Sequence, residues 1–194
     1  MRTESGGGSM RILGERVLHE QAWTLLKEKR YLNTRGKEGR WTYIERRERR
    51  EAAVIVAATE RSGSLVLIEQ FRIPFEAEVL EFPAGLIDPG ETPQQTACRE
   101  LAEETGYTGK VLHVGPGVSS TAGLSTEIVH MVYMRVAEEP TLVPQHEDSE
   151  RIRVFTLRPE DVGGFLSECE RENRILDAKL YTYLRDRLQG GDRP

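Results

Sequence analysis

Apolar and polar residues alternate along three segments within the first fifty residues. These segments are residues 15–19, 23–31 and 41–47, and a loop with two glycines at 33–39 separates the last two. Alternation of this kind is typical of a β-strand that buries one face, so the pattern predicts a small antiparallel sheet. Because a sheet of this size buries little apolar surface by itself, we expect it to need a partner surface.

From Ala52 onwards the pattern changes to mostly apolar runs bounded by polar turns, which is typical of central strands. Two later segments, 159–166 and 175–188, predict helices, and the second repeats leucine every four residues. Strands and helices interleave around one core, so the sequence predicts an α/β fold with a mixed sheet. The strand segments are residues 52–58, 64–70, 78–83, 111–114, 127–136 and 151–156.

Residues 93–105 carry clear signals for a helix of about three turns. Thr92 suits the N-cap, Pro93 suits the first helical position, and Gln95 stands three residues after the cap, as in a capping box. Gly106 is a natural helix stop. The sequence therefore predicts both ends of this helix.

Three carboxylates, those of Glu100, Glu103 and Glu104, share a face of this helix, because residues three and four apart lie side by side. Like charges at this spacing destabilise an isolated helix by about 0.2–0.5 kcal/mol per pair. A hard divalent cation such as Mg²⁺ would compensate, and the loop at 85–90 can fold back to add a backbone carbonyl. A solvated acidic helix face is the alternative interpretation.

Composition narrows the class of protein. The chain has 194 residues and a net charge of −5, which argues against a general nucleic-acid-binding surface. Two cysteines are too few for a disulfide framework or a zinc site, and Cys98 is expected to be a small buried residue of the helix. No apolar run predicts a membrane span or a signal peptide, so we expect a cytoplasmic protein. Residues 1–10 are expected to be a flexible leader.

The stretch from Gly85 to Tyr107 resembles the Nudix box, GX5EX7REUXEEXGU, at every position, with U an aliphatic or aromatic residue. The resemblance implies a Nudix hydrolase with an α/β/α sandwich fold. It implies that the enzyme depends on Mg²⁺ and that Mn²⁺ can substitute for Mg²⁺. It implies that Arg99 orients the glutamates and that Glu91 supports the network from the loop. The implied metal ligands are Glu100, Glu103 and Glu104.

A wider resemblance, to the ADP-ribose pyrophosphatase branch of that family, covers roughly residues 20–188 and is strongest from 66 to 107. It implies a homodimer in which the N-terminal β subdomain, residues 11–50, swaps across the interface. The Nudix hydrolase domain would then be residues 51–190. In this branch Ala84 would give its carbonyl to a metal, Glu81 would contact metal-bound water or the ribose, and Arg72 would hold a phosphate.

The same resemblance assigns a base-binding role to three residues of the N-terminal segment. Trp23 and Trp41 match two positions whose indoles sandwich the adenine, one from each subunit, and Arg46 matches a base-contacting arginine. An ordinary core or interface position is the alternative for each tryptophan, and a surface ion pair is the alternative for Arg72. The chain departs from the branch at Ala122, where a proline is usual, so we expect less strict selection of the sugar.

A general base is expected in the acid-rich loop at 145–154, for which a solvated acidic loop is the alternative interpretation. Glu150 aligns best with the base of the branch, and Glu147 and Asp148 are substitutes. The expected reaction is hydrolysis of the diphosphate of ADP-ribose or a related nucleoside diphosphate sugar, which gives a nucleoside monophosphate and a sugar phosphate. Two alternatives remain: a Nudix hydrolase of dinucleoside polyphosphates or capped RNA ends, and a non-catalytic nucleotide sensor on the same scaffold.

Overall fold

A computed structural model describes residues 8–146 and 151–190 and divides into two compact units. The first unit comprises residues up to Glu51 together with Val118–Val129, and the second comprises Ala52–Gly117 together with the chain from His130 onwards. None of the described helices is long and apolar enough to cross a membrane.

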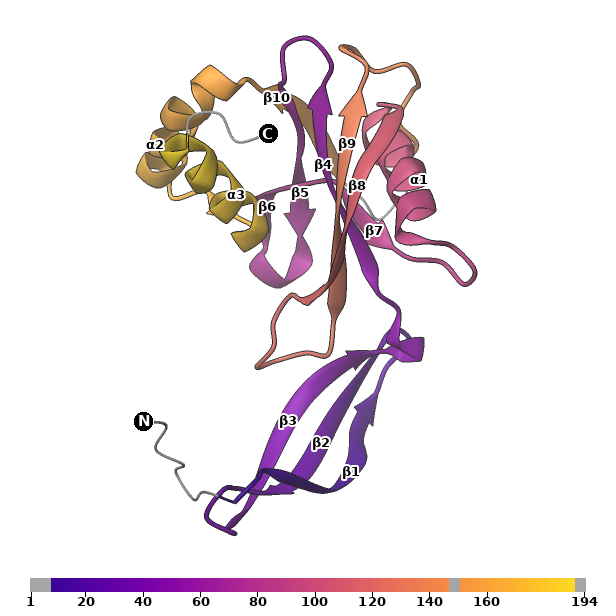
Figure 1. Ribbon diagram of the computed structural model, residues 1–194, viewed down its shortest axis with the longest axis vertical. Helices are drawn as coiled ribbons and strands as arrows, with labels where there is room; N and C mark the ends of the chain where they lie inside the picture. The colour runs from indigo at the N-terminus through magenta and orange to yellow at the C-terminus, as the bar shows by residue number, and fades with distance from the viewer. Residues whose placement is uncertain (1–7, 147–150, 191–194) are drawn as a thin grey trace, which may run out of the picture. The chain divides into compact units, whose positions relative to one another are not determined.

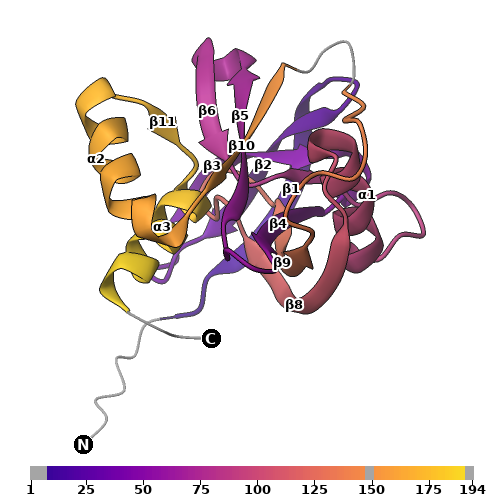
Figure 2. The same cartoon turned by 90° about the horizontal axis from the view of Figure 1, so that it is seen from above.

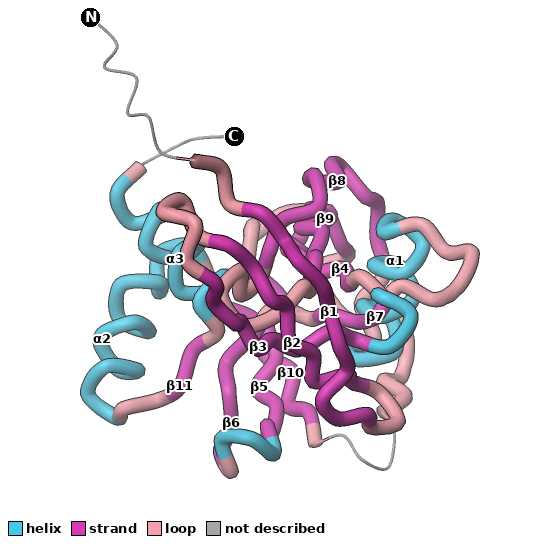
Figure 3. Tube along the Cα trace, turned by 90° about the horizontal axis from the view of Figure 1, so that it is seen from below, coloured by secondary structure: helices cyan, strands magenta, loops and turns pink. Residues whose placement is uncertain are grey.

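The first unit is built on a three-stranded antiparallel sheet in the order β1-β2-β3, as the alternating pattern predicts (Figure 3). Its strands are β1 (Arg11–Glu20), β2 (Thr24–Leu32) and β3 (Glu38–Arg46). Lys27 occupies the centre of β2, where it lies 2.9 Å from Glu45 and 2.5 Å from Glu15. Tyr43 donates its hydroxyl to Glu15 at 2.6 Å, so one face of this sheet is organised by a charged cluster.

Many large apolar side chains of this unit are solvent-exposed, because three strands cannot cover both of their own faces. Trp23 is 75% exposed, Ile12 is 59% exposed and Trp41 is 53% exposed. Val17, Leu18, Leu26 and Ile44 are exposed as well. The exposed apolar side chains lie on both faces of the sheet, because Leu26 pairs with Ile44 while the neighbouring Lys27 pairs with Tyr43 and Val17.

The second unit is an eight-stranded mixed sheet in the order β11-β6-β5-β4-β9-β8, with β10 paired to β5 and β7 paired to β4. The central strand β4 is almost completely buried, and Ala53, Ile55 and Ala57 are at 0% exposure. This explains why its sequence is a continuous apolar run rather than an alternating one. The strands are β4 (Ala52–Thr59), β5 (Leu65–Arg72), β6 (Ala77–Glu81), β7 (Ala84–Leu86), β8 (Gly109–Ser119), β9 (Ile128–Val136), β10 (Ile152–Leu157) and β11 (Ile175–Leu176).

Helices cover both faces of this sheet, so the second unit is an α/β/α sandwich (Figures 1 and 2). Helix α1 (Pro93–Thr105) lies on one side, and helices α2 (Val162–Glu172) and α3 (Ala178–Gln189) lie on the other. Ala97 and Leu101 of α1 are fully buried against a core that includes Ile55 of β4 and Val132 of β9. The mixed α/β fold expected from the sequence is confirmed.

Two helix boundaries and one burial expectation differ from the sequence prediction. The predicted helix at 159–166 begins as a 3-10 turn, Pro159–Asp161, and continues as α2 to Glu172. The predicted helix at 175–188 begins only at Ala178, because Ile175 and Leu176 pair in parallel with β6. Cys98 is exposed rather than buried, since its position lies off the α1 stripe that carries Ala97 and Leu101.

Candidate active site

Helix α1 begins and ends at the residues that the sequence predicts. Thr92 Oγ1 accepts the backbone N–H of Gln95 at 3.3 Å, and the side-chain oxygen of Gln95 accepts the backbone N–H of Thr92 at 2.9 Å. Gly106 adopts a left-handed φ of 72° and donates its N–H to the Ala102 carbonyl at 3.0 Å. The capping box and the glycine stop therefore fix the position of the motif glutamates on the helix.

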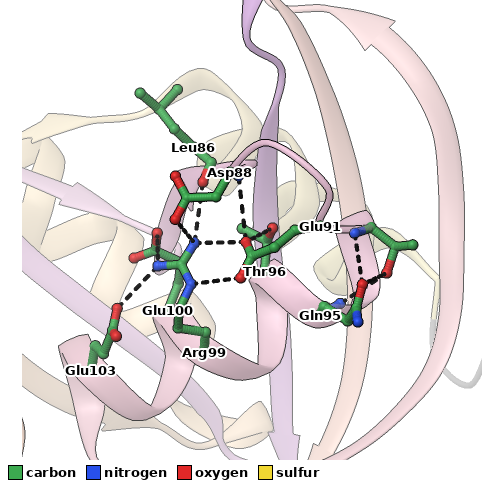
Figure 4. Close-up of polar contacts among 9 residues, drawn as sticks. Leu86, Asp88, Glu91, Gln95, Thr96, Arg99, Glu100 and Glu103 are labelled. Atoms are coloured by element: carbon green, nitrogen blue, oxygen red, sulfur yellow. Dashed lines mark hydrogen bonds and ion pairs between the residues drawn. The ribbon is translucent and has the colours of Figure 1, made fainter.

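The guanidinium of Arg99 connects three glutamates of the motif (Figure 4). Its Nε and Nη2 donate to the two oxygens of Glu91 at 3.0 and 2.9 Å, while Nη1 donates to Glu100 at 2.8 Å and to Glu103 at 3.1 Å. Nη2 also donates to the Leu86 carbonyl at 3.3 Å. One arginine thus joins the loop to the helix and fixes the direction of the acidic side chains.

The loop glutamate stays ionised within this network. The pKa of Glu91 is lowered from 4.5 to about 2. The largest cause is the hydrogen bonding with Arg99, and the next is the hydrogen bond from the Thr96 hydroxyl at 2.6 Å. Glu91 in turn is the main cause of the raised pKa of Arg99. Both groups are therefore charged at neutral pH, so the ion pair between Glu91 and Arg99 persists there.

The backbone of strand β7 lies against the carboxylates of Glu100 and Glu104. Glu104 is only 5% exposed, and its Oε2 accepts the N–H of Ala84 at 3.1 Å. The carboxyl group of Glu100 rests on Gly85, where a Cβ would overlap it. A residue with any side chain at position 85 would therefore displace Glu100, which explains the glycine at the start of the motif.

The donor set of this site fits a hard cation. Among residues 8–146 and 151–190, no group of three or more His, Cys, Asp or Glu side chains is gathered so as to hold a metal ion. Glu100 and Glu103 are instead directed at Arg99, which compensates their charge. Even so, Glu100, Glu103 and Glu104 offer carboxylate oxygens from one helix, and the β7 backbone lies against two of them, Glu100 and Glu104. Mg²⁺ prefers oxygen donors of this kind.

Arg72, the last residue of β5, forms a bidentate ion pair with Glu81, the last residue of the adjacent antiparallel strand β6. Arg72 Nε lies 2.7 Å from Glu81 Oε1, and Arg72 Nη2 lies 2.8 Å from Glu81 Oε2. Glu81 is the main cause of the raised pKa of Arg72. The sequence suggested separate roles for these residues, whereas the structure couples them directly.

The segment 141–146 covers the carboxyl end of α1, a feature that sequence reasoning missed. Gln145 donates its N–H to the Glu103 carbonyl at 2.7 Å, and His146 Nε2 donates to the Glu104 carbonyl at 2.8 Å. Since the last carbonyls of a helix lack partners within it, a capping segment was to be expected, but nothing in the sequence says which. The candidate bases Glu147 and Glu150 follow directly and lie outside the described residues.

The three base-binding candidates all lie in the first unit. Trp23 stands in the turn between β1 and β2. Trp41 donates its indole N–H to the Gly123 carbonyl at 3.1 Å, and Arg46 donates to Glu127 Oε1 at 2.7 Å. The structure thus places each candidate on an exposed part of the N-terminal sheet.

Comparison with known proteins matches the sequence of this chain to a family. The family model for the NUDIX domain matches residues 48–178. The chain is 32% identical over 193 residues to the ADP-sugar pyrophosphatase of Mus musculus, with 93% of this chain and 88% of that protein covered. It is 34% identical over 145 residues to the ADP-ribose pyrophosphatase of Bacillus subtilis (strain 168), with 71% and 75% covered.

A solved structure supports the same fold. The crystal structure of an ADP compounds hydrolase superposes with a TM-score of 0.67 at 23% sequence identity, and 85% of this chain and 86% of that chain are covered. The domain match spans well over half of the chain and includes the whole α1 motif with its Arg99 network. The chain therefore belongs to the Nudix hydrolase family.

Proposed function

We propose that the protein hydrolyses the diphosphate bond of ADP-ribose or a related nucleoside diphosphate sugar, to give a nucleoside monophosphate and a sugar phosphate. The observation that carries the proposal is the Arg99 network, which holds Glu91, Glu100 and Glu103 together beside the buried Glu104. The substrate class is supported by relatives that are ADP-sugar and ADP-ribose pyrophosphatases.

The carboxylates of Glu100, Glu103 and Glu104, with the carbonyl of Ala84, would hold Mg²⁺. When bound, the metal neutralises phosphate charge and lowers the pKa of the attacking water. Arg99 keeps Glu100 and Glu103 in place before the metal arrives, because its Nη1 donates to both carboxylates. Pre-positioned ligands lose less side-chain entropy when they bind.

Arg72 is the side chain we assign to a substrate phosphate. Glu81 holds its Nε and Nη2, and within the part of the chain that the structure describes Nη1 makes no hydrogen bond. A guanidinium fixed on one edge offers its remaining N–H groups in a defined direction, which suits a phosphate oxygen. The raised pKa of Arg72 keeps that charge at every working pH.

The proton of the attacking water would be removed by a carboxylate of the acidic loop, with Glu150 as our first assignment and Glu147 as the second. At the other end of the substrate, Trp23 and Trp41 would stack on the base, one from each subunit of a homodimer. Aromatic stacking tolerates different bases, because every base presents a π-face. Both indoles are more than half exposed in this chain, which is consistent with such a role.

Turnover across a panel of nucleoside-diphosphate-linked compounds, with and without Mg²⁺, tests the proposal. We expect Mg²⁺-dependent release of a nucleoside monophosphate from ADP-ribose, ADP-glucose or GDP-mannose. Faster turnover of dinucleoside polyphosphates would assign the protein to another Nudix substrate class. Binding of these compounds without turnover would favour the sensor alternative. Glu150→Gln and Glu147→Gln, compared in the same assay, would identify the base.

A further inference from the structure

Residues 119–127, called here the 119–127 loop, comprise the last residue of β8 and the connection to β9. They pair with strand β3 at the open edge of the N-terminal sheet. Ile44 of β3 donates its N–H to the Leu124 carbonyl at 2.9 Å, and Thr126 donates its N–H to the Ile44 carbonyl at 3.1 Å. The pairing forms a parallel bridge between Ile44 and Ser125. The loop thus behaves as a short fourth strand, although nearly eighty residues separate it from β3 in the sequence.

This loop also holds two of the side chains assigned to the base end of the substrate. The Gly123 carbonyl accepts the indole N–H of Trp41, as described above. Glu127 Oε1 accepts a hydrogen bond from Arg46 Nε at 2.7 Å and lies 2.7 Å from Arg46 Nη2, and Glu127 Oε2 accepts the Ser120 hydroxyl at 2.7 Å. A three-residue relay, Ser120 to Glu127 to Arg46, therefore runs from the start of the loop to the end of β3.

The relay borders a cavity. Arg46, Thr126 and Glu127 line a space of about 300 Å³, together with Lys29 and other charged side chains. That volume is at the lower end of the range for small-molecule sites. The Arg46 side chain is 40% exposed and the Glu127 side chain is 23% exposed, so the arginine faces solvent while its carboxylate partner is the more enclosed of the two. The enclosed carboxylate can therefore hold the guanidinium in one direction while part of the guanidinium stays accessible to a ligand.

We propose that Glu127 is a positioning residue, which holds Arg46 toward the nucleobase and makes the 119–127 loop a determinant of base recognition. This inference rests on the proposed function, since it needs a nucleotide at Arg46. Glu127 acts through the arginine and touches no reacting atom. Without it, the guanidinium of Arg46 would lose its charge-assisted partner and sample several directions, at a cost in binding.

Three single variants separate positioning from a general structural effect. Glu127→Ala should raise KM for ADP-ribose by roughly tenfold and leave kcat within about twofold, because a charge-assisted contact at the base end is lost. Glu127→Gln keeps one acceptor oxygen, which can still face Arg46 without the negative charge, while the amide N–H can donate to the Ser120 hydroxyl, so its KM should be intermediate. Glu38→Ala is the matched control: it removes a glutamate 3.2 Å from Arg30 on the same sheet, and its KM should equal that of the wild type.

A double-mutant cycle tests whether Glu127 works through Arg46. In an Arg46→Ala background, Glu127→Ala should have no additional effect on KM or on Kd. Kd for ADP-ribose without metal is measured by tryptophan fluorescence, since both tryptophans of the chain, Trp23 and Trp41, lie in this unit. This readout does not depend on turnover. The thermal midpoint of each variant, measured alongside, should stay within a few degrees of the wild type.

The outcomes separate the two proposals. A Glu127→Ala protein with unchanged KM and Kd, or an effect that persists in full without Arg46, would overturn the positioning role while wild-type hydrolysis still supports the function. A wild-type protein that neither hydrolyses nor binds any nucleoside diphosphate sugar would overturn the function and this inference together. A selective rise in KM that Arg46→Ala abolishes supports the inference.

Discussion

The backbone of Gly85 lies directly against the carboxyl group of Glu100, so that a Cβ at position 85 would overlap the carboxylate. The group in the way is the far end of a flexible side chain, and it can rotate aside at little cost in packing. The contact therefore matters for the position of a proposed metal ligand more than for the stability of the fold.

Gly85→Ala should lower kcat by at least about tenfold and change the free energy of unfolding by less than about 1 kcal/mol. The reason is that the Glu100 carboxylate would have to rotate away from position 85 and would lose its hydrogen bond from Arg99 Nη1. Steady-state kinetics with Mg²⁺ and a urea titration measure the two effects. Gly164→Ala on α2 is the control, because a Cβ there meets nothing within 4 Å. Unchanged kcat in Gly85→Ala would show that Glu100 can bind the metal from another direction.

Glu104→Gln removes one charge from the proposed metal site without changing its shape. The amide oxygen can still accept the Ala84 N–H, so the local structure should survive. We expect kcat to fall by at least about a hundredfold, or about 2.7 kcal/mol, with a weaker apparent affinity for Mg²⁺. Activity measured over a range of Mg²⁺ concentrations checks this. The same substitution at the exposed Glu168 of α2 should have no effect, and near-normal turnover in Glu104→Gln would remove this residue from the site.

Because large apolar side chains of the N-terminal sheet are exposed, we expect a homodimer that covers part of them. Ile12 is 59% exposed on β1, and a charge there would be buried and unpaired in an interface. We expect the wild type to sediment as a dimer and Ile12→Glu to dissociate at a higher protein concentration, with loss of activity. Leu112→Glu places the same charge at a leucine of the second unit that is 61% exposed, and should leave the dimer intact. A fully active wild-type monomer would contradict the swapped assembly.

Local signals made the motif helix predictable. Thr92, Gln95 and Gly106 each act on backbone groups within a few residues, so their effect does not depend on the rest of the fold. The same holds for the inward face of α1, where Ala97 and Leu101 lie one turn apart. The alternating strands β1 to β3 were predictable for a similar reason, since hydrophobic period alone identifies them.

Long-range pairing was not predictable in the same way. Ile175 and Leu176 continue a helical pattern in sequence, yet they join β6, because a sheet edge accepts any extended pair of apolar residues. Strand β7 is three residues long and has no period to detect. The contacts of Gln145 and His146 with α1, and of Glu127 with Arg46, join segments forty to eighty residues apart. A single sequence shows which residues can form hydrogen bonds or ion pairs, but it does not show which distant residue each of them contacts.

The cluster around Lys27 predicts how the N-terminal sheet responds to acid. Hydrogen bonds from Lys27 first and Tyr43 second lower the pKa of Glu15 from 4.5 to about 2. Because the folded pKa is the lower one, the stabilisation is fully present above about pH 4.5 and is lost as the pH falls toward 2. Glu15→Gln should be less stable than the wild type at neutral pH, and the difference should vanish near pH 2.

Urea unfolding followed by tryptophan fluorescence measures this difference, since Trp23 and Trp41 report on this unit. Glu38→Gln serves as the control, because the Glu38 and Arg30 side chains are about half exposed and such pairs contribute little. A wild-type protein and a Glu15→Gln protein with the same unfolding midpoint at pH 7 would show that the Lys27 cluster does not stabilise the sheet.

Ala122 occupies a turn that a proline would fit. The Thr121 carbonyl accepts the N–H of Leu124 at 2.9 Å, which puts Ala122 second in a four-residue turn, the position that proline favours. Among the described backbone hydrogen bonds, Ala122 is not a donor, so a proline would cost none of them. Ala122→Pro should therefore fold normally and raise the free energy of unfolding by about 0.4–1 kcal/mol, because it restricts the unfolded chain.

The same substitution should sharpen selection of the sugar. With alanine, the loop keeps freedom to adapt, so we expect the wild type to turn over ADP-glucose or GDP-mannose within about a hundredfold of ADP-ribose in kcat/KM, a gap of about 2.7 kcal/mol. A proline at position 122 fixes φ near about −65° and should widen the gap. Competing substrates in one reaction give the ratio directly, and Ala122→Ser, which leaves φ unrestrained, should keep the wild-type ratio. If Ala122→Pro stabilises the protein but leaves the ratio unchanged, loop rigidity does not set specificity, and selection of the sugar depends on other contacts.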